Sequence, residues 1–140
     1  RFRNVTGVQT CALPIYSPWS TAQFKEEFAG IPKTRFMLVA ESENRIVGYC
    51  AIFLPSAAAA ADVLTVAVLP EFRRQGIARE LMRQMEQWAT ERGATSVMLE
   101  VETFNESAIA LYQALGYSQI STRANYYGFG QDAYVMAKEL

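Results

Sequence analysis

Hydrophobic residues recur along this chain with two different periods, and the changes of period predict its elements. Apolar runs at residues 35–42 and 46–55, separated by "ENR", predict two strands joined by a hairpin turn. Residues 62–70 are almost all apolar, which predicts a third strand that is buried on both faces and ended by Pro70. Three further strands are expected, at residues 96–101, near 117–125 and at 133–137.

Three segments carry the helical period instead. From Gly76 to Arg92 apolar side chains recur every three or four residues, and "ERG" supplies a stop. A brief helix should follow Ser20, which can cap it. Another helix is expected at residues 106–115, with Asn105 as its cap and Gly116 after its end. This order of elements predicts one mixed α/β domain.

Residues 5–15, "VTGVQTCALPI", follow neither period. They match, codon by codon, the translation of a common sequencing-library adapter, which would not be part of the native protein. We therefore expect residues 1–15 to be a non-native segment and residues 16–140 to be a single domain; a genuine but irregular amino terminus is the alternative. Without residues 1–15, eleven basic residues face fourteen acidic ones, and the net charge falls from -1 to -3.

The amino-acid composition limits which classes of function the chain can have. No apolar run reaches the roughly 20 residues of a membrane helix, and the charge provides no broad cationic surface for nucleic acid. Cys11 and Cys50 have neither metal-ligand spacing nor a disulfide framework, which suits the reducing cytoplasm. The chain has no histidine, so no metal site is expected and carboxylates and tyrosines would have to move protons.

The junction "VAVLPEFRRQGIAR" at residues 66–79 is the best candidate for a site. It runs from a strand through a basic turn into a helix, whose first turn has unpaired N–H groups that can bind an anion. Gly76 would let a phosphate approach the backbone, and Arg73, Arg74 and Arg79 add positive charge. The chain lacks the glycine patterns of common nucleotide-binding loops. A plain solvated helix start is the alternative.

The segment "RRQGIA" fits the pattern R/Q-x-x-G-x-G/A, and from residue 16 to residue 140 the chain resembles the GNAT acetyltransferase superfamily. The resemblance implies a GNAT fold: a mixed, mostly antiparallel sheet, splayed at its fourth and fifth strands and flanked by helices. The first strand would be missing or replaced here. It also implies acetyl-CoA as cosubstrate, held by Val66, Ala67, Val68, Arg73, Arg74, Gln75, Gly76, Ile77, Ala78, Arg79 and Asn105.

The segment "LEVETFNESAIALYQALGY" is similar to the bacterial subgroup that acetylates the amino-terminal alanine of a small-subunit ribosomal protein. In that subgroup a glutamate on the fifth strand is the general base and a tyrosine on the next helix is the general acid. The resemblance assigns these roles to Glu100 and Tyr112. An edge-facing charge at Glu100 and a packed aromatic at Tyr112 are the alternatives.

The segment "RANYYGFGQDAYVM" resembles the substrate loop of the same subgroup, but Gln131 stands where a glutamate is usual. The resemblance places Trp19, Tyr126 and Tyr127 at the groove for the acceptor peptide. Plain packing of the tyrosine pair is the alternative.

The resemblance implies acetyl transfer from acetyl-CoA to the α-amine of a protein amino terminus, by direct attack, with a ribosomal protein as the expected partner. The alternatives are the same chemistry on a small-molecule amine or a lysine, and a module that binds acyl-CoA without turnover.

Overall fold

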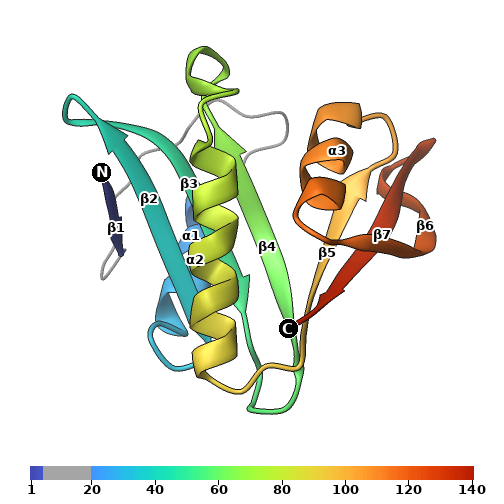
Figure 1. The fold of residues 1–140 in the computed structure, drawn as a ribbon, viewed down its shortest axis with the longest axis horizontal. Helices are drawn as coiled ribbons and strands as arrows, with labels where there is room; N and C mark the ends of the chain where they lie inside the picture. The colour runs from blue at the N-terminus through green and yellow to red at the C-terminus, as the bar shows by residue number, and fades with distance from the viewer. Residues whose placement is uncertain (5–19) are drawn as a thin grey trace.

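A seven-stranded sheet with strand order β1-β2-β3-β4-β5-β7-β6 organises the fold (Figure 1). The computed structural model describes residues 1–4 and 20–140. In chain order the elements are β1 Phe2–Asn4, α1 Thr21–Ala29, β2 Arg35–Ser42, β3 Arg45–Phe53, β4 Ala60–Val68, the 3-10 helix η1 Pro70–Phe72, α2 Ile77–Glu91, β5 Ser96–Glu102, α3 Glu106–Ala114, β6 Ser118–Gly128 and β7 Gln131–Glu139.

Local sequence signals start and stop the helices as expected. Ser20 and Gln23 form a capping box at the start of α1. Gly76 precedes α2 with φ +82°, and Gly93 follows its end with φ +80°, conformations that cost glycine little. No helix in the described ranges is long and apolar enough to cross a membrane.

The helices cover both faces of the sheet. Tyr49 and Cys50 are neighbours on β3, so their side chains point to opposite faces. Tyr49 meets the ring of Phe24 on α1 at 5.8 Å, whereas the Cys50 thiol contacts the Leu81 carbonyl of α2. Figure 1 accordingly shows α2 in front of the sheet and α1 behind it.

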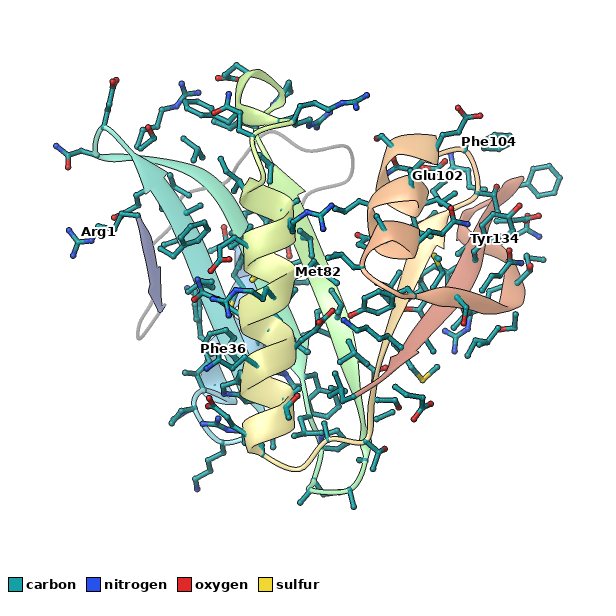
Figure 2. The ribbon with its side chains drawn as sticks, viewed as in Figure 1. Arg1, Phe36, Met82, Glu102, Phe104 and Tyr134 are labelled. Carbon is teal, nitrogen blue, oxygen red and sulfur yellow. The ribbon has the colours of Figure 1, made fainter. Side chains whose placement is uncertain are left out.

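The core lies mainly between α2 and strands β2–β4. Trp88 of α2 stacks on Phe36 of β2, with ring centroids 5.6 Å apart. Figure 2 shows Phe36 beside α2, the helix that carries Met82. Leu81, Met82 and Met85 are fully buried, and each such side chain contributes about 1.5–3 kcal/mol of burial free energy. The apolar face of α2 that the sequence predicts is therefore the face that packs against the sheet.

One expectation about the strands is corrected by the structure. The strand predicted to be buried on both faces is not: Asp62 is exposed and residues 63–66 are only half-buried, because β5 covers that edge of β4 only over residues 60–62. The segment that resembles a substrate loop lies at the ends of β6 and β7. Within it, residues 124–127 of β6 stand opposite the single residue Asp132 and lie outside the regular ladder. Its role in binding an acceptor stays a prediction.

The first-strand position is occupied by a very short strand. β1 pairs antiparallel with β2, with Phe2 opposite Ala40 and Asn4 opposite Leu38. Its residues belong to the segment that the sequence predicts to be non-native. That origin stays a prediction.

Candidate active site

β4 and β5 are paired only at one end. Their parallel ladder joins residues 60–62 to residues 96–98, and beyond it the two strands diverge (Figure 1). β5 turns away to pair with β7 along its whole length. Residues 63–68 of β4 therefore have no strand partner on this side. An unpaired edge offers N–H and C=O groups to an extended ligand, and Val66, Ala67 and Val68 lie on it.

A β-bulge interrupts β4 beside this gap. Ala51 pairs with Thr65 and Ile52 pairs with Val63, so Leu64 is an extra residue on β4. A bulge rotates the neighbouring peptide groups and leaves the extra residue outside the ladder. It gives the strand a backbone irregularity at the gap, where an N–H donor can turn toward a ligand.

The turn before α2 presents a row of free backbone donors. Among the backbone hydrogen bonds of the described residues, the amides of residues 74–79 donate none, and the first helical bond runs from Glu80 to the Gly76 carbonyl. Arg74 has φ +63° and Gly76 has φ +82°. A Cβ added to Gly76 would have no heavy atom within 4 Å. The turn is therefore an open cradle for an anion, at the positive end of a helix.

The side chains of this turn have different surroundings. The Arg73 Nε donates to the Val68 carbonyl at 3.1 Å, which ties the turn to the end of β4. Ile77 and Ala78 are half-buried and pack against the core. The remaining three predicted side chains are exposed and available to a ligand: Arg74, Gln75 and Arg79.

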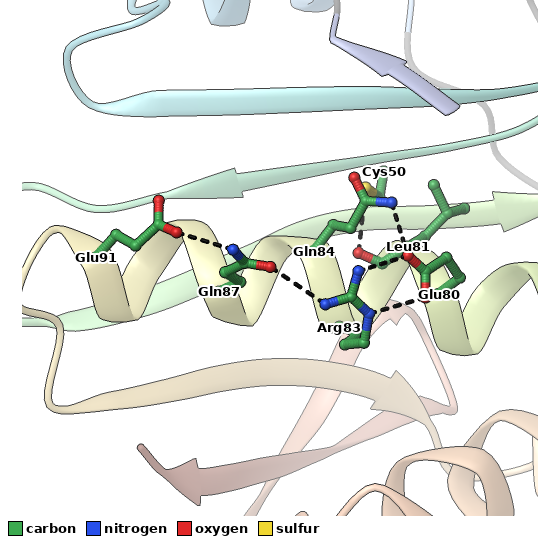
Figure 3. Close-up of polar contacts among 7 residues, drawn as sticks. All are labelled: Cys50, Glu80, Leu81, Arg83, Gln84, Gln87 and Glu91. Carbon is green, nitrogen blue, oxygen red and sulfur yellow. Dashed lines mark hydrogen bonds and ion pairs between the residues drawn. The ribbon is translucent and has the colours of Figure 1, made fainter. Parts of the chain in front are cut away.

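A ladder of polar contacts runs along the outer face of α2 (Figure 3). Its first carboxylate, Glu80, accepts from Arg83 at 2.7 Å and from Gln84 at 2.8 Å. The Arg83 hydrogen bond, with a further one from Gln84, lowers the pKa of Glu80 to about 2. Glu80 is therefore ionised in the first helical turn, and Arg83 offsets the charge that would otherwise oppose a bound anion.

Glu100 lies on the face of the sheet that carries α1. Asp62 is opposite Phe53 on β3 and opposite Met98 on β5, so these three side chains share a face. Glu100 follows Met98 by two residues and points the same way. The predicted base is thus beside the gap between β4 and β5.

An arginine pairs with this carboxylate. The Arg123 guanidinium is 3.1 Å from the Glu100 Oε1 and 5.4 Å from the centre of the Tyr126 ring. Asp62 is exposed overall, but neighbouring groups partly desolvate its carboxyl group and raise its pKa, and the charge of Arg123 opposes that rise. Neither Asp62 nor Arg123 was predicted from the sequence, because the β4–β5 ladder brings Asp62 beside β5 and the β5-β7-β6 register brings Arg123 to Glu100.

Tyr112 lies on the opposite face of the sheet from Glu100. It belongs to α3, which lies on the same side of the sheet as α2 (Figure 1). Burial raises the pKa of Tyr112 to about 12, so the phenol keeps its proton at neutral pH. Its ring meets the edge of Tyr117 at 6.0 Å. A proton donor and a carboxylate thus lie on the two faces of the β5 half of the sheet.

The predicted acceptor tyrosines lie over Glu100. Tyr126 and Tyr127 meet edge to face at 4.9 Å, and the Tyr127 hydroxyl donates to the Glu100 carbonyl at 3.1 Å. Burial raises the pKa of Tyr127, and the charges of Tyr126 and Glu100 raise it further. Trp19, the third predicted acceptor residue, lies outside the described residues.

Asn105 is a helix cap, as its spacing predicts. Its Oδ1 accepts from the Ala108 amide at 3.2 Å at the start of α3. A coenzyme contact at Asn105 stays a prediction. In the described part of the chain, no group of three or more His, Cys, Asp or Glu side chains could hold a metal ion.

Comparison with known proteins assigns the chain to a family. The model of the acetyltransferase (GNAT) family matches residues 6–117. The chain belongs to this family. A GNAT acetyltransferase from Elizabethkingia anophelis, solved with acetyl-CoA bound, shares the fold at TM-score 0.79 and 16% identity, covering 100% of this chain and 97% of that one.

Relatives of higher identity carry more specific names. The N-alpha-acetyltransferase RimI of Mycobacterium tuberculosis is 35% identical over 125 residues, covering 87% of this chain and 76% of the relative. The structure of the ribosomal-protein-S18-alanine N-acetyltransferase from Escherichia coli has TM-score 0.74 and 27% identity, covering 88% and 78%. The chain spans only 34% of an uncharacterized protein of Mycobacterium leprae and 53% of an N-alpha-acetyltransferase of Saccharolobus solfataricus.

Proposed function

We propose that this chain transfers the acetyl group of acetyl-CoA to the α-amino group of a protein amino terminus. The observation that carries the proposal is the gap itself, since an unpaired strand edge borders it and a carboxylate and a protonated phenol lie on the two faces of the β5 half of the sheet. Relatives named for acetylating the alanine terminus of ribosomal protein bS18 support an amino-terminal acceptor, and a small-subunit ribosomal protein is our expected partner.

The coenzyme site would be the turn and the strand edge together. Amides of residues 74–79, with Arg74 and Arg79, would hold the pyrophosphate, because they are unpaired and lie at the positive end of α2. Residues 66–68 would pair with the pantetheine arm through their free edge. The coenzyme supplies an acetyl thioester, which an amine can attack directly.

Glu100 is assigned the role of general base. An α-amine has a pKa of about 7.7–8.0, so near neutral pH a carboxylate can take its proton, directly or through one water. The new C–N bond forms as the C–S bond breaks, and Tyr112 gives its proton to the departing thiolate. A backbone N–H near the Leu64 bulge would stabilise the oxyanion.

The acceptor is tested by competition among amines. Purified protein is incubated with acetyl-CoA and, separately, an alanine-starting peptide, an α-blocked lysine peptide and spermidine. We expect the acetyl group on the α-amine of the first peptide, located by mass spectrometry. Preferential acetylation of the lysine side chain or of spermidine would reject the amino-terminal assignment.

The base is tested with a matched pair of variants. Glu102 lies two residues beyond Glu100 on the same strand and the same face, and both side chains are half-buried. Loss of a general base costs about 10²–10⁴-fold in rate. We expect Glu100→Gln to lose at least about 10²-fold in kcat/KM, whereas Glu102→Gln keeps most of it. Equal losses in both would show that Glu100 has no special role.

A further inference from the structure

The two halves of the sheet are held together by few polar contacts. The β4–β5 ladder contains only three residue pairs. Within the described residues, both side-chain hydrogen bonds between α2 and the β5–β7 half end on Glu86. The Tyr117 hydroxyl donates to one of its oxygens at 2.9 Å, and the Lys138 Nζ donates to the other at 2.7 Å. Glu86 therefore connects the helix of the anion site to the half that carries Glu100 and Tyr112.

The three residues Glu86, Tyr117 and Lys138, here called the Glu86 cluster, are largely buried. The Glu86 side chain is only 14% exposed and that of Lys138 is 27% exposed. Tyr117 is almost fully buried, and the Lys138 Nζ lies 5.8 Å from the centre of its ring. A charged side chain that is shielded from water is stable only beside an opposite charge or a hydrogen-bonding group. Glu86, Tyr117 and Lys138 therefore hold one another in place.

Tyr117 in turn determines the surroundings of Tyr112. The two rings meet at 61° with centroids 6.0 Å apart, and the Tyr117 amide donates to the Tyr112 carbonyl at 3.0 Å. No hydrogen bond of the described residues involves the Tyr112 hydroxyl, so packing alone orients that phenol. A shift of the Tyr117 ring would thus move the Tyr112 ring.

We propose that Glu86 is a positioning residue for acetyl transfer: it holds the Tyr117 ring, which fixes the Tyr112 ring relative to α2 and its coenzyme site. The proposal rests on the general-acid role of Tyr112 in the function proposed above. It does not depend on which amine is the acceptor. Glu86 itself touches no reacting atom.

The first measurement is single-turnover acetyl transfer, with the acceptor amine that the wild-type protein uses. A misplaced catalytic group costs up to about 10²-fold, so we expect Glu86→Ala and Tyr117→Phe to slow transfer about tenfold, with KM for acetyl-CoA within twofold. Glu86→Gln keeps a carbonyl oxygen for Tyr117 and should recover most of the rate. Glu91→Gln is the control, since Glu91 lies on the same helix and, among the described residues, its side chain accepts a hydrogen bond only from Gln87.

The decisive measurement is a double-mutant cycle with Tyr112→Phe. If Glu86 acts through Tyr112, the double variant Glu86→Ala/Tyr112→Phe is no slower than Tyr112→Phe alone, because the group to be positioned is already gone. A merely structural role would instead multiply the two losses. Tyr117→Phe enters the same cycle, and since it leaves the Glu86–Lys138 pair intact, it is usable even if Glu86→Ala unfolds.

The outcomes separate this inference from the proposed function. Multiplicative losses in both cycles, or wild-type rates in Tyr117→Phe and Glu86→Ala, overturn the positioning role and leave the function standing. A wild-type rate in Tyr112→Phe overturns the general-acid assignment and this inference with it. A change of acceptor overturns only the amino-terminal assignment, and the cycle is then run on the new amine.

Discussion

Replacing Gly76 by alanine should change two separate quantities: the free energy of unfolding and the affinity for coenzyme A. Gly76 has φ +82°, and an added Cβ would meet no heavy atom within 4 Å. The left-handed conformation costs an L-residue about 1–2 kcal/mol, so Gly76→Ala should lower the free energy of unfolding by about that amount without any steric clash. In a chain of this length the melting temperature would fall by roughly 3–6 °C.

Gly130 provides a matched control for this substitution. It has φ +74°, its surroundings are equally open, and it lies in the β6–β7 turn, far along the chain from α2. Gly130→Ala should therefore lose similar stability. Only the Cβ at position 76 would enter the space through which a phosphate reaches the unpaired amides.

The expected loss of coenzyme affinity follows from the hydrogen bonds at stake. A bond to a charged group contributes about 1.5–3 kcal/mol, so losing one raises the Kd for coenzyme A by roughly 10- to 100-fold. Isothermal titration calorimetry measures that Kd, and urea denaturation measures stability. Wild-type affinity in Gly76→Ala would remove the turn from the coenzyme site. An equal affinity loss in Gly130→Ala would attribute the effect to global destabilisation.

Four further predictions use other features of the structure. Burial and the Glu86 carboxylate raise the pKa of Tyr117 above its ordinary value of 10.0, so its neutral phenol stabilises the fold below pH 10. Urea denaturation should show stability falling as the pH rises above 10, less steeply in Tyr117→Phe; equal slopes would contradict this. Cys50 is buried, with its pKa raised by burial, so mass spectrometry should find iodoacetamide on Cys50 only after unfolding. Arg123→Gln breaks a pair whose arginine is 56% exposed, so the free energy of unfolding should change by less than about 1 kcal/mol; a change above 2 kcal/mol would refute this. Genomic DNA read upstream of codon 16 should encode residues unlike residues 1–15.

The helices and the positions of the strands along the chain could be predicted because local signals agreed with the tertiary fold, whereas the arrangement of the sheet came only from the family resemblance. The stretch from Ser20 to Ala29 has a capping box, and the apolar period of α2 matches the face that packs on the sheet. Strand exposure could not be predicted from the same signals. Residues 62–70 are almost all apolar, yet Asp62 is exposed and residues 63–66 are half-buried, because most of β4 lies beside the gap.

The candidate site could be predicted only where its residues are contiguous in the chain. The turn at Arg73 and Gly76 is one segment, so its glycine and basic residues predict an anion site directly. The surroundings of Glu100 come from three strands, and nothing in the sequence places Arg123 or Asp62 beside it. Likewise, the sequence does not distinguish Glu86 from the other polar residues of α2. Only the structure shows that Tyr117 and Lys138 contact it.

The short β4–β5 ladder has a mechanical consequence. Only three residue pairs join β4 to β5 at the centre of the sheet, so the seam between them has fewer backbone hydrogen bonds than the ladders on either side. An extended coenzyme lying along β4 would act as an additional strand and close part of that seam. Ligand at about 100 times its Kd adds about 2.7 kcal/mol to stability. Loading with acetyl-CoA would then stiffen the molecule before any acceptor arrives, with the amide protons beside the gap exchanging more slowly.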